Sequence, residues 1–105
     1  MHVDFFSTPQ SQVLYEGRKT TLACHVQGNA FWRLNGTIYS ELNTAFFESQ
    51  GITSFDFFLG GSEVNMTLTI VGSVLNNNTV INCISVQQNV AVNISENATI
   101  TVLGE

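Results

Sequence analysis

Three short segments that alternate apolar and polar residues constrain this chain most, because each carries one conspicuous residue on its apolar side. They comprise residues 21–24, 31–34 and 79–83. Alternation with a period of two is typical of a half-buried β-strand. Cys24, Trp32 and Cys83 therefore fall on the inward faces of three different strands, and two packed sheets can bring them together.

This layout resembles the immunoglobulin domain, in which a disulfide between strands B and F packs against a tryptophan on strand C. Residues 15–24, which run Tyr-Glu-Gly-x-x-x-Thr-Leu-x-Cys, look like the A′–B hairpin of that family. The resemblance covers nearly the whole chain. It implies an all-β, immunoglobulin-like β-sandwich of two antiparallel sheets, joined by one Cys24–Cys83 disulfide, of a diverged V-set or I-set type.

The predicted core consists of apolar residues on the inward faces of the strands. They are Leu22, Trp32, Leu34, Leu68, Ile70 and Ile81. The chain-entropy model assigns about 4 kcal/mol to a bridge that closes a loop as long as the one between Cys24 and Cys83. Because such a domain has a total stability of only about 5–10 kcal/mol, the bridge decides whether it folds.

The length of 105 residues predicts one immunoglobulin-like domain over residues 1–105. The sequence stops just after the last predicted strand, at Leu103-Gly104-Glu105. We therefore expect this domain to be excised from a longer ectodomain.

The charge balance excludes several classes of partner. The net charge is −5, and the basic residues are only Arg18, Lys19 and Arg33. Nucleic-acid binding needs clustered basic residues, and so does binding to an anionic membrane surface. No apolar run approaches the roughly 20 residues of a membrane span. We therefore expect no nucleic-acid partner and no direct membrane insertion.

Five Asn-x-Ser/Thr sequons indicate the compartment. They begin at Asn35, Asn65, Asn77, Asn93 and Asn97. Each is a candidate N-glycosylation site. Together with the two cysteines they favour an oxidising, extracellular setting, either in the ectodomain of a membrane-anchored protein or in a secreted one.

No catalytic, cofactor or metal site is predicted. The histidines are His2, near a terminus, and His25, on the outward side of a strand, and neither belongs to a nucleophile, zinc or phosphate-binding motif. A metal site would need several ligands at suitable spacing. Both cysteines are better used in the bridge, so we expect a protein that is not an enzyme.

The alternation also predicts the strand order. The expected strands cover residues 3–7, 12–15, 19–26, 30–34, 37–39, 55–59, 66–70, 79–86 and 97–102. Pro9 indicates an edge strand or one that changes sheets, and Asn35-Gly36 indicates a type I′ hairpin turn. No helical period is visible. Residues 40–53 are indeterminate, which leaves V-set against I-set open.

The predicted binding surface is the outer face of the sheet that contains strands G, F, C and C′, the usual docking surface of related receptors. The candidate contact residues are Phe31, Arg33, Tyr39, Ile84, Val86, Gln87, Gln88 and Asn89. Exposed apolar residues around an arginine have the composition of a binding hot spot. Phe31 and Ile84 are equally compatible with an ordinary cross-strand pair that stabilises the sheet.

Two features complicate this assignment. Asn35, Asn93 and Asn97 are expected to lie beside or on the same face, where glycans would narrow the accessible patch. The phenylalanines at 46, 47 and 58 could form a second exposed patch, although we expect them to fill the core.

The predicted function is extracellular recognition of a protein, either a cell-surface or secreted ligand or a second copy of this chain. An alternative is a structural spacer in a multi-domain adhesion or matrix glycoprotein, with glycans shielding both faces. A secreted viral or microbial immunoglobulin-like decoy is a third possibility.

Overall fold

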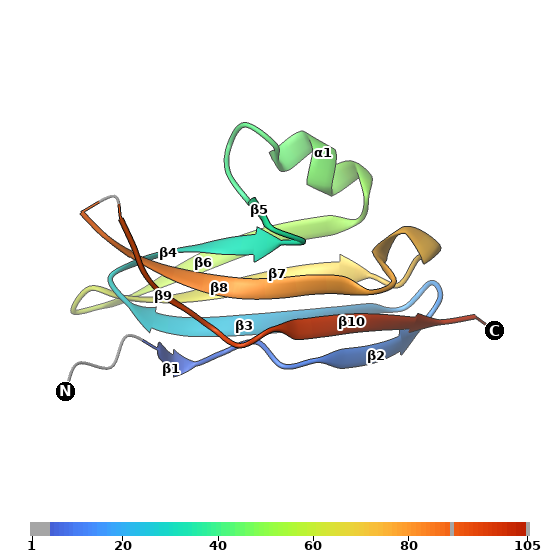
Figure 1. The fold of residues 1–105 in the computed structure, drawn as a ribbon, viewed down its shortest axis with the longest axis horizontal. Helices are drawn as coiled ribbons and strands as arrows, with labels where there is room; N and C mark the ends of the chain where they lie inside the picture. Colours follow the sequence, from blue (N-terminus) through green and yellow to red (C-terminus); the bar gives the residue numbers. More distant parts are fainter. Residues whose placement is uncertain (1–4, 89, 105) are drawn as a thin grey trace.

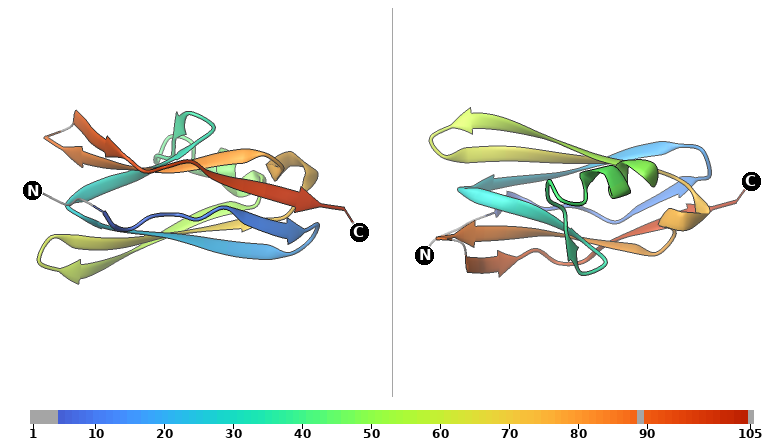
Figure 2. Two further views of the ribbon diagram at one scale, coloured as in Figure 1. Left: turned by 60° about the horizontal axis from the view of Figure 1, so that its bottom comes forward. Right: turned by 90° about the horizontal axis from the view of Figure 1, so that it is seen from above.

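Two β-sheets packed face to face make up the part of the chain that the structure, a computed structural model, describes: residues 5–88 and 90–104. The back sheet contains, in order, β1 (Phe5–Ser7), β3 (Lys19–Gln27), β7 (Glu63–Val71) and β6 (Ile52–Gly60). The front sheet contains, in order, β2 (Gln12–Tyr15), β10 (Ala98–Leu103), β8 (Thr79–Gln87), β4 (Asn29–Leu34) and β5 (Thr37–Ile38), and β9 (Val90–Ile94) also pairs with β8. Figure 1 labels the strands, and Figure 2 shows the two layers. The predicted all-β sandwich is confirmed.

The core lies around the disulfide that joins the two sheets. Cys24 on β3 is bonded to Cys83 on β8, with a Cα–Cα distance of 6.4 Å. Trp32 is paired with Cys83 in the register of β4 and β8 and is fully enclosed. The residues that alternation places inside are all buried: Leu22, Trp32, Leu34, Leu68, Ile70 and Ile81.

The N-terminal segment changes sheets at Pro9, as the sequence indicates. β1 pairs with β3 in the back sheet, whereas β2 pairs in parallel with β10 in the front sheet. Proline has no N–H to donate to a ladder, so it suits the point where one pairing ends and another begins. Residues 3 and 4 of the first predicted strand lie outside the described residues.

The turn between β4 and β5 has the predicted type I′ conformation. Its two central residues have positive φ, 49° at Asn35 and 84° at Gly36, as this turn requires. The Asn35 N–H donates to the Val80 carbonyl, and the Val80 N–H donates to Asn35 Oδ1, both at 2.8 Å. These bonds join the turn to β8.

Residues 40–53 contain the helix α1 (Thr44–Ser49), so the expectation of no helix is wrong. The helix has only six residues, too few for a helical period to be visible in the sequence. Its one buried side chain, Phe47, packs into the core and stacks on Tyr39 with ring centroids 5.3 Å apart. No helix within the described ranges is long and apolar enough to cross a membrane.

The expectation that all three phenylalanines fill the core is wrong for two of them. Phe47 is buried, but Phe46 lies on the exposed side of α1 and Phe58 is 85% exposed. Phe58 belongs to β6, which is nine residues long and forms one edge of the back sheet. An edge strand has no neighbour on its free side, so strand formation alone does not bury its side chains.

The last predicted strand is divided into β9 and β10, which both pair with β8. Ser95 lies in the break, where its N–H donates to the Cys83 carbonyl and its Oγ accepts from the Cys83 N–H, at 2.9 and 2.8 Å. A side-chain oxygen therefore takes the place of one backbone acceptor. Asn97 also lies in this break and not in a strand, contrary to the expectation.

Asn76 stabilises the corner between β7 and β8 through hydrogen bonds. It ends the short 3₁₀ helix η1 (Val74–Asn76) and is 1% exposed. Its Nδ2 donates to the carbonyls of Gln50 and Val71, at 2.8 and 2.7 Å. Buried backbone carbonyls need such donors, so Asn76 connects the end of β7 to the segment between α1 and β6.

Replacing both cysteines by alanine tests the role of the bridge. We expect the free energy of unfolding to fall by about 4 kcal/mol, because the unfolded chain regains the freedom of a long loop. Guanidinium denaturation of the double variant and of the natural protein measures the difference. A loss below about 1 kcal/mol would show that the packing around Trp32 holds the sheets together without the bond.

The carboxyl of Asp56 on β6 makes stability depend on pH. Asp56 is exposed at the surface, but neighbouring groups partly desolvate its carboxyl and raise its pKa above the ordinary value of 3.8, because desolvation penalises the charged form. A raised pKa in the folded state favours folding while the group is protonated, and this contribution is lost as the pH rises through the raised pKa. We therefore expect the thermal midpoint of Asp56→Asn, relative to the natural protein, to increase between about pH 3 and about pH 7. A constant difference over this range would contradict the assignment.

Candidate functional site

An apolar row crosses the outer face of the front sheet, on the side away from the core. Phe31 on β4 pairs with Ile84 on β8, which pairs in turn with Ile94 on β9. Directly paired residues share a face, with Cβ atoms about 4.5–5.5 Å apart. Phe31 and Ile94 are 42% and 51% exposed, whereas Ile84 between them is 4% exposed.

The expectation that Ile84 is exposed for contact with a partner is therefore wrong. Its paired neighbours on both sides, Phe31 and Ile94, flank it on the same face. Ile84 acts as the cross-strand packing residue that the alternative interpretation describes. The accessible part of the row consists of the two outer residues.

Arg33 lies beside this row and is half-buried. Its Nη2 donates to Asn82 Oδ1 at 3.2 Å, and its register neighbour on β5 is Ile38. Its Nε is buried and has no hydrogen-bond partner among the described residues. No carboxylate of the described residues forms an ion pair with Arg33. A buried, unpaired guanidinium N–H is costly unless it finds an acceptor.

Asn82 organises the polar side of this face. It is 2% exposed, and its Nδ2 donates to the Ser95 carbonyl and to Asn97 Oδ1, at 3.1 and 2.8 Å. Its Oδ1 accepts from Arg33. One buried amide therefore holds both the arginine and the break between β9 and β10.

Tyr39 does not join the face, contrary to the expectation. It is half-buried, packs against the core and stacks on Phe47. Its N–H donates to the Trp32 carbonyl at 2.8 Å, which keeps it alongside β4. Val86 lies on the expected side of β8, opposite Asn29, but is only partly exposed.

The turn that follows β8 lies at one end of the sandwich. Gln87 and Gln88 are exposed, and Gln88 has a φ of 52°. The third expected contact residue of this turn, Asn89, lies outside the described residues. Both glutamines line an open hollow of about 430 Å³, together with Gly28, Asn29, Phe58, Ser62, Val64 and Val86.

The sequons are distributed over both sheets. Asn93 pairs with Ser85, whose side chain lies on the core side of β8, so the expectation that Asn93 points outward with Phe31 is wrong. Asn65 pairs with His25 and with Phe57 on the outer face of the back sheet. Asn93 is nevertheless exposed, as are Asn35, Asn77 and Asn97. The Oδ1 of each of the last three accepts a hydrogen bond, from Val80 N–H for Asn35, from Val102 N–H for Asn77 and from Asn82 Nδ2 for Asn97.

The sequence did not lead us to predict two exposed residues of the front face. Ile94 lies on β9 and is exposed, but it was not among the expected contact residues. Ile38 on β5 pairs with Arg33 and is exposed. The alternation of Ile94 with the polar residues Asn93 and Ser95 is a strand pattern that could have indicated the first of them.

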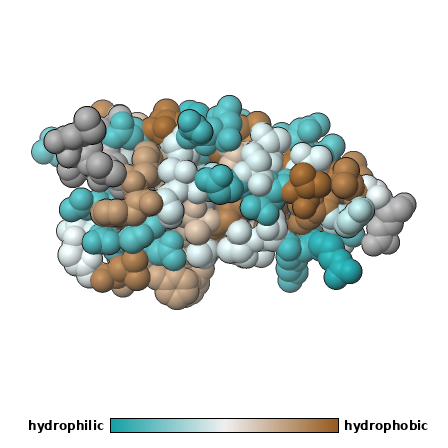
Figure 3. Space-filling model, turned by 90° about the horizontal axis from the view of Figure 1, so that it is seen from below, coloured by the Kyte–Doolittle hydropathy of each residue, from teal (hydrophilic) through white to brown (hydrophobic). Residues whose placement is uncertain are grey.

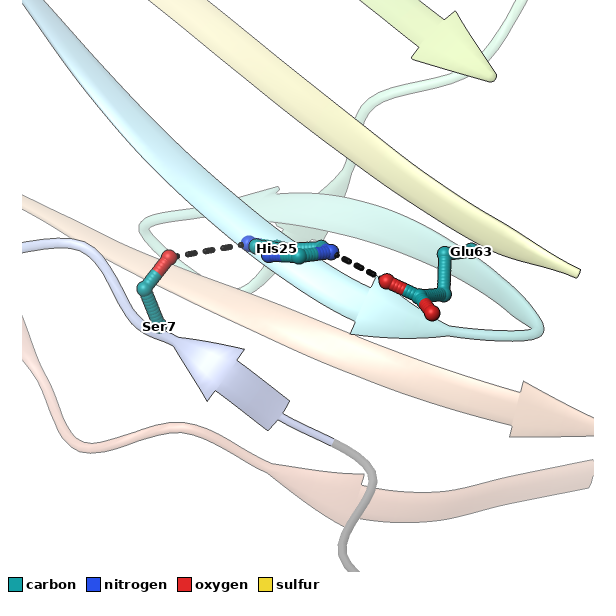
Figure 4. A network of polar contacts seen from close by, with 3 residues as sticks. All are labelled: Ser7, His25 and Glu63. Atoms are coloured by element: carbon teal, nitrogen blue, oxygen red, sulfur yellow. Dashed lines mark hydrogen bonds and ion pairs between the residues drawn. The ribbon is translucent and has the colours of Figure 1, made fainter. Parts of the chain in front are cut away.

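The back sheet carries a polar and aromatic cluster on its outer face. His25 Nε2 lies 2.8 Å from Glu63 Oε1, and the His25 N–H donates to Ser7 Oγ at 3.3 Å (Figure 4). The ring of Phe6 lies 4.7 Å from the His25 ring, centroid to centroid. Figure 3, which shows the molecule from below, has hydrophobic side chains both toward its left end and near its right end, with more polar ones between them.

The outer faces of the two sheets present apolar, amide and charged side chains. Among residues 5–88 and 90–104, no group of three or more His, Cys, Asp or Glu side chains could hold a metal ion. His25 is engaged by Glu63 on a sheet surface. The front face offers apolar area beside the partly exposed guanidinium of Arg33, which suits binding to a protein surface.

Comparisons with known proteins identify the architecture. No protein-family model and no curated protein matches the sequence. The structure is similar to that of Rst D1-D2, with a TM-score of 0.70 and 23% identity over 95% of this chain and 48% of that one. It is also similar to the N-terminal eight Ig domains of Down Syndrome Cell Adhesion Molecule, with a TM-score of 0.65 and 12% identity over 95% of this chain and 12% of that one. For the titin M3 domain the TM-score is 0.63 and the identity 14%, over 93% of both chains. This chain therefore has the immunoglobulin fold.

Proposed function

We propose that this chain is a non-enzymatic extracellular recognition module of a cell-surface receptor or adhesion protein, which binds a protein partner through the outer face of its front sheet. The observation that carries the proposal is the apolar row of Phe31 and Ile94 over buried Ile84, next to the partly exposed Arg33. Aromatic residues and arginine are enriched in the centres of protein interfaces.

The chemistry of Arg33 indicates what the partner presents. Its Nε is buried, but the side chain as a whole is partly exposed, and no carboxylate among the described residues forms an ion pair with it. A partner carboxylate placed against the exposed part of the guanidinium would form a charge-assisted hydrogen bond there. We infer that the partner offers an Asp or Glu side chain at this point, surrounded by apolar residues that cover Phe31 and Ile94.

The extracellular setting is supported by the covalent chemistry of the chain. The Cys24–Cys83 bond persists in oxidising compartments. In their side-chain hydrogen bonds to the described residues, Asn35, Asn77 and Asn97 use Oδ1 and not Nδ2, the atom to which an N-glycan is attached. One of the similar structures, that of Down Syndrome Cell Adhesion Molecule, is by its name a cell adhesion molecule.

One observation favours the spacer role as a second candidate. β1 begins toward one end of the long axis and β10 ends toward the other (Figure 1). Neighbouring domains could then be joined end to end. Glycans on the front sheet at Asn35 and Asn97, and on the back sheet at Asn65, would shield both faces of such an array.

Charged substitutions in the apolar row separate the two candidates. We expect Phe31→Asp and Ile94→Asp each to weaken partner binding at least tenfold, about 1.4 kcal/mol, because a carboxylate would be desolvated against an apolar surface. Sedimentation velocity of the glycosylated protein over a concentration series measures self-association. A multimerised form tested against a panel of purified extracellular proteins measures binding to other partners.

The matched control is Phe46→Asp, which places the same charge on an exposed phenylalanine of α1. It should leave binding unchanged, and thermal unfolding should show that all three variants are folded. If Phe31→Asp and Ile94→Asp bind as well as the control, the front face is not the binding site. A protein that is monomeric and binds nothing in the panel would support the spacer role.

A further inference from the structure

Asn65 lies at the centre of an aromatic cluster on the outer face of the back sheet. In the register of β3, β7 and β6 it is directly opposite His25 on one side and Phe57 on the other. Directly opposed side chains have Cβ atoms about 4.5–5.5 Å apart, within reach of aromatic rings. Asn65 is itself partly exposed and begins the sequon Asn65-Met66-Thr67.

Each neighbour of Asn65 is part of an aromatic pair. Phe57 contacts Phe55 edge to face with ring centroids 4.8 Å apart, and these residues are 49% and 62% exposed. On the other side, the ring of exposed Phe6 lies 4.7 Å from that of His25. Glu63 and Ser7 hold His25 in place (Figure 4). Two exposed apolar surfaces therefore flank the sequon asparagine.

We propose that an N-linked glycan on Asn65 folds onto this face, with its first N-acetylglucosamine packed against the ring of Phe57 and bordered by His25. One face of the pyranose ring presents C–H groups, which pack on the negative face of an aromatic ring. The polar groups of the sugar then face water. The glycan covers apolar area that a monomeric protein would otherwise leave exposed.

The position of the sequon favours a sugar over a protein partner as the occupant. A glycan attached between the two aromatic pairs obstructs any protein that approaches them. The same glycan lies next to β6, a nine-residue edge strand with an unpaired side. Such edges pair with other chains unless they are covered, so the glycan also protects this edge from association.

The other sequons lack this environment. Asn93 pairs with Ser85 on β8. Asn35 lies in a hairpin turn, and Asn77 and Asn97 lie between strands. None of these four is paired in the described strands with an aromatic residue. Asn65 is therefore the sequon at which an attached sugar has aromatic rings directly on both sides.

The inference rests on the extracellular setting of the proposed function, but not on the front face. Asn65 and Phe57 lie on the back sheet, whereas Phe31 and Ile94 lie on the front sheet. Asn65→Gln should thus leave partner binding unchanged. Failure of the glycan proposal and failure of the front-face proposal can be distinguished in separate measurements.

The test uses protein secreted from eukaryotic cells, with occupancy of Asn65 measured by mass spectrometry. Endoglycosidase treatment trims each glycan to a single N-acetylglucosamine. We expect the trimmed natural protein to have a thermal midpoint about 4 °C above that of trimmed Asn65→Gln. In a Phe57→Thr background this difference should disappear, because threonine retains strand propensity but offers no ring. In a Phe46→Thr background it should persist.

A second readout does not depend on any variant. Protons of a sugar ring that lies over Phe57 are shifted upfield in the NMR spectrum by the ring current, and we expect this shift for the Asn65 sugar alone. The proposal is overturned if Asn65 is unoccupied, if the midpoint difference is absent or survives Phe57→Thr, or if the sugar protons show no shift. Self-association of the glycosylated protein that Phe57→Thr abolishes would also overturn it.

Discussion

The structure depends on the bond between Cys24 and Cys83, which joins the central strands β3 and β8 of the two sheets. Trp32 lies beside it, paired with Cys83, and is buried with its Nε1 lacking a hydrogen-bond partner among the described residues. That unpaired N–H costs stability. Covalent closure of a long loop and the burial of a large ring offset this cost. Together they fix the distance between the two sheets, and the outer faces of both sheets depend on it.

The front face is shaped by a local break in its sheet. Ser95 bonds to Cys83 through both its N–H and its Oγ, and Asn82 bonds to the Ser95 carbonyl and to Asn97. The break separates β9 from β10, so that Ile94 lies next to Ile84 and completes the apolar row. The same Asn82 holds Arg33 at the edge of that row. β8, the strand that contains Cys83, thus pairs with both strands that carry the proposed binding residues, β4 and β9.

The two sheets differ in what their outer faces present. The front sheet presents Phe31 and Ile94 beside the positive charge of the partly exposed Arg33, which suits a protein that supplies a carboxylate. The back sheet presents two aromatic pairs around a sequon asparagine, which suits a sugar attached to this chain. The glycan on Asn65 would then cover the exposed edge of the back sheet at β6, and the apolar row of the front sheet would stay accessible to a partner.

The sequence by itself determined the features that depend on local pattern: the alternating strands, the inward positions of both cysteines and Trp32, the sheet change at Pro9 and the type I′ turn at Asn35. Only the tertiary structure decided what depends on neighbours distant along the chain. Ile84 is buried because Phe31 and Ile94 flank it, and Phe58 is exposed because β6 lies at an edge. The short helix α1 depends on the burial of a single side chain, Phe47. Local periodicity shows which side of a strand a residue occupies, but packing between strands decides whether that side is covered.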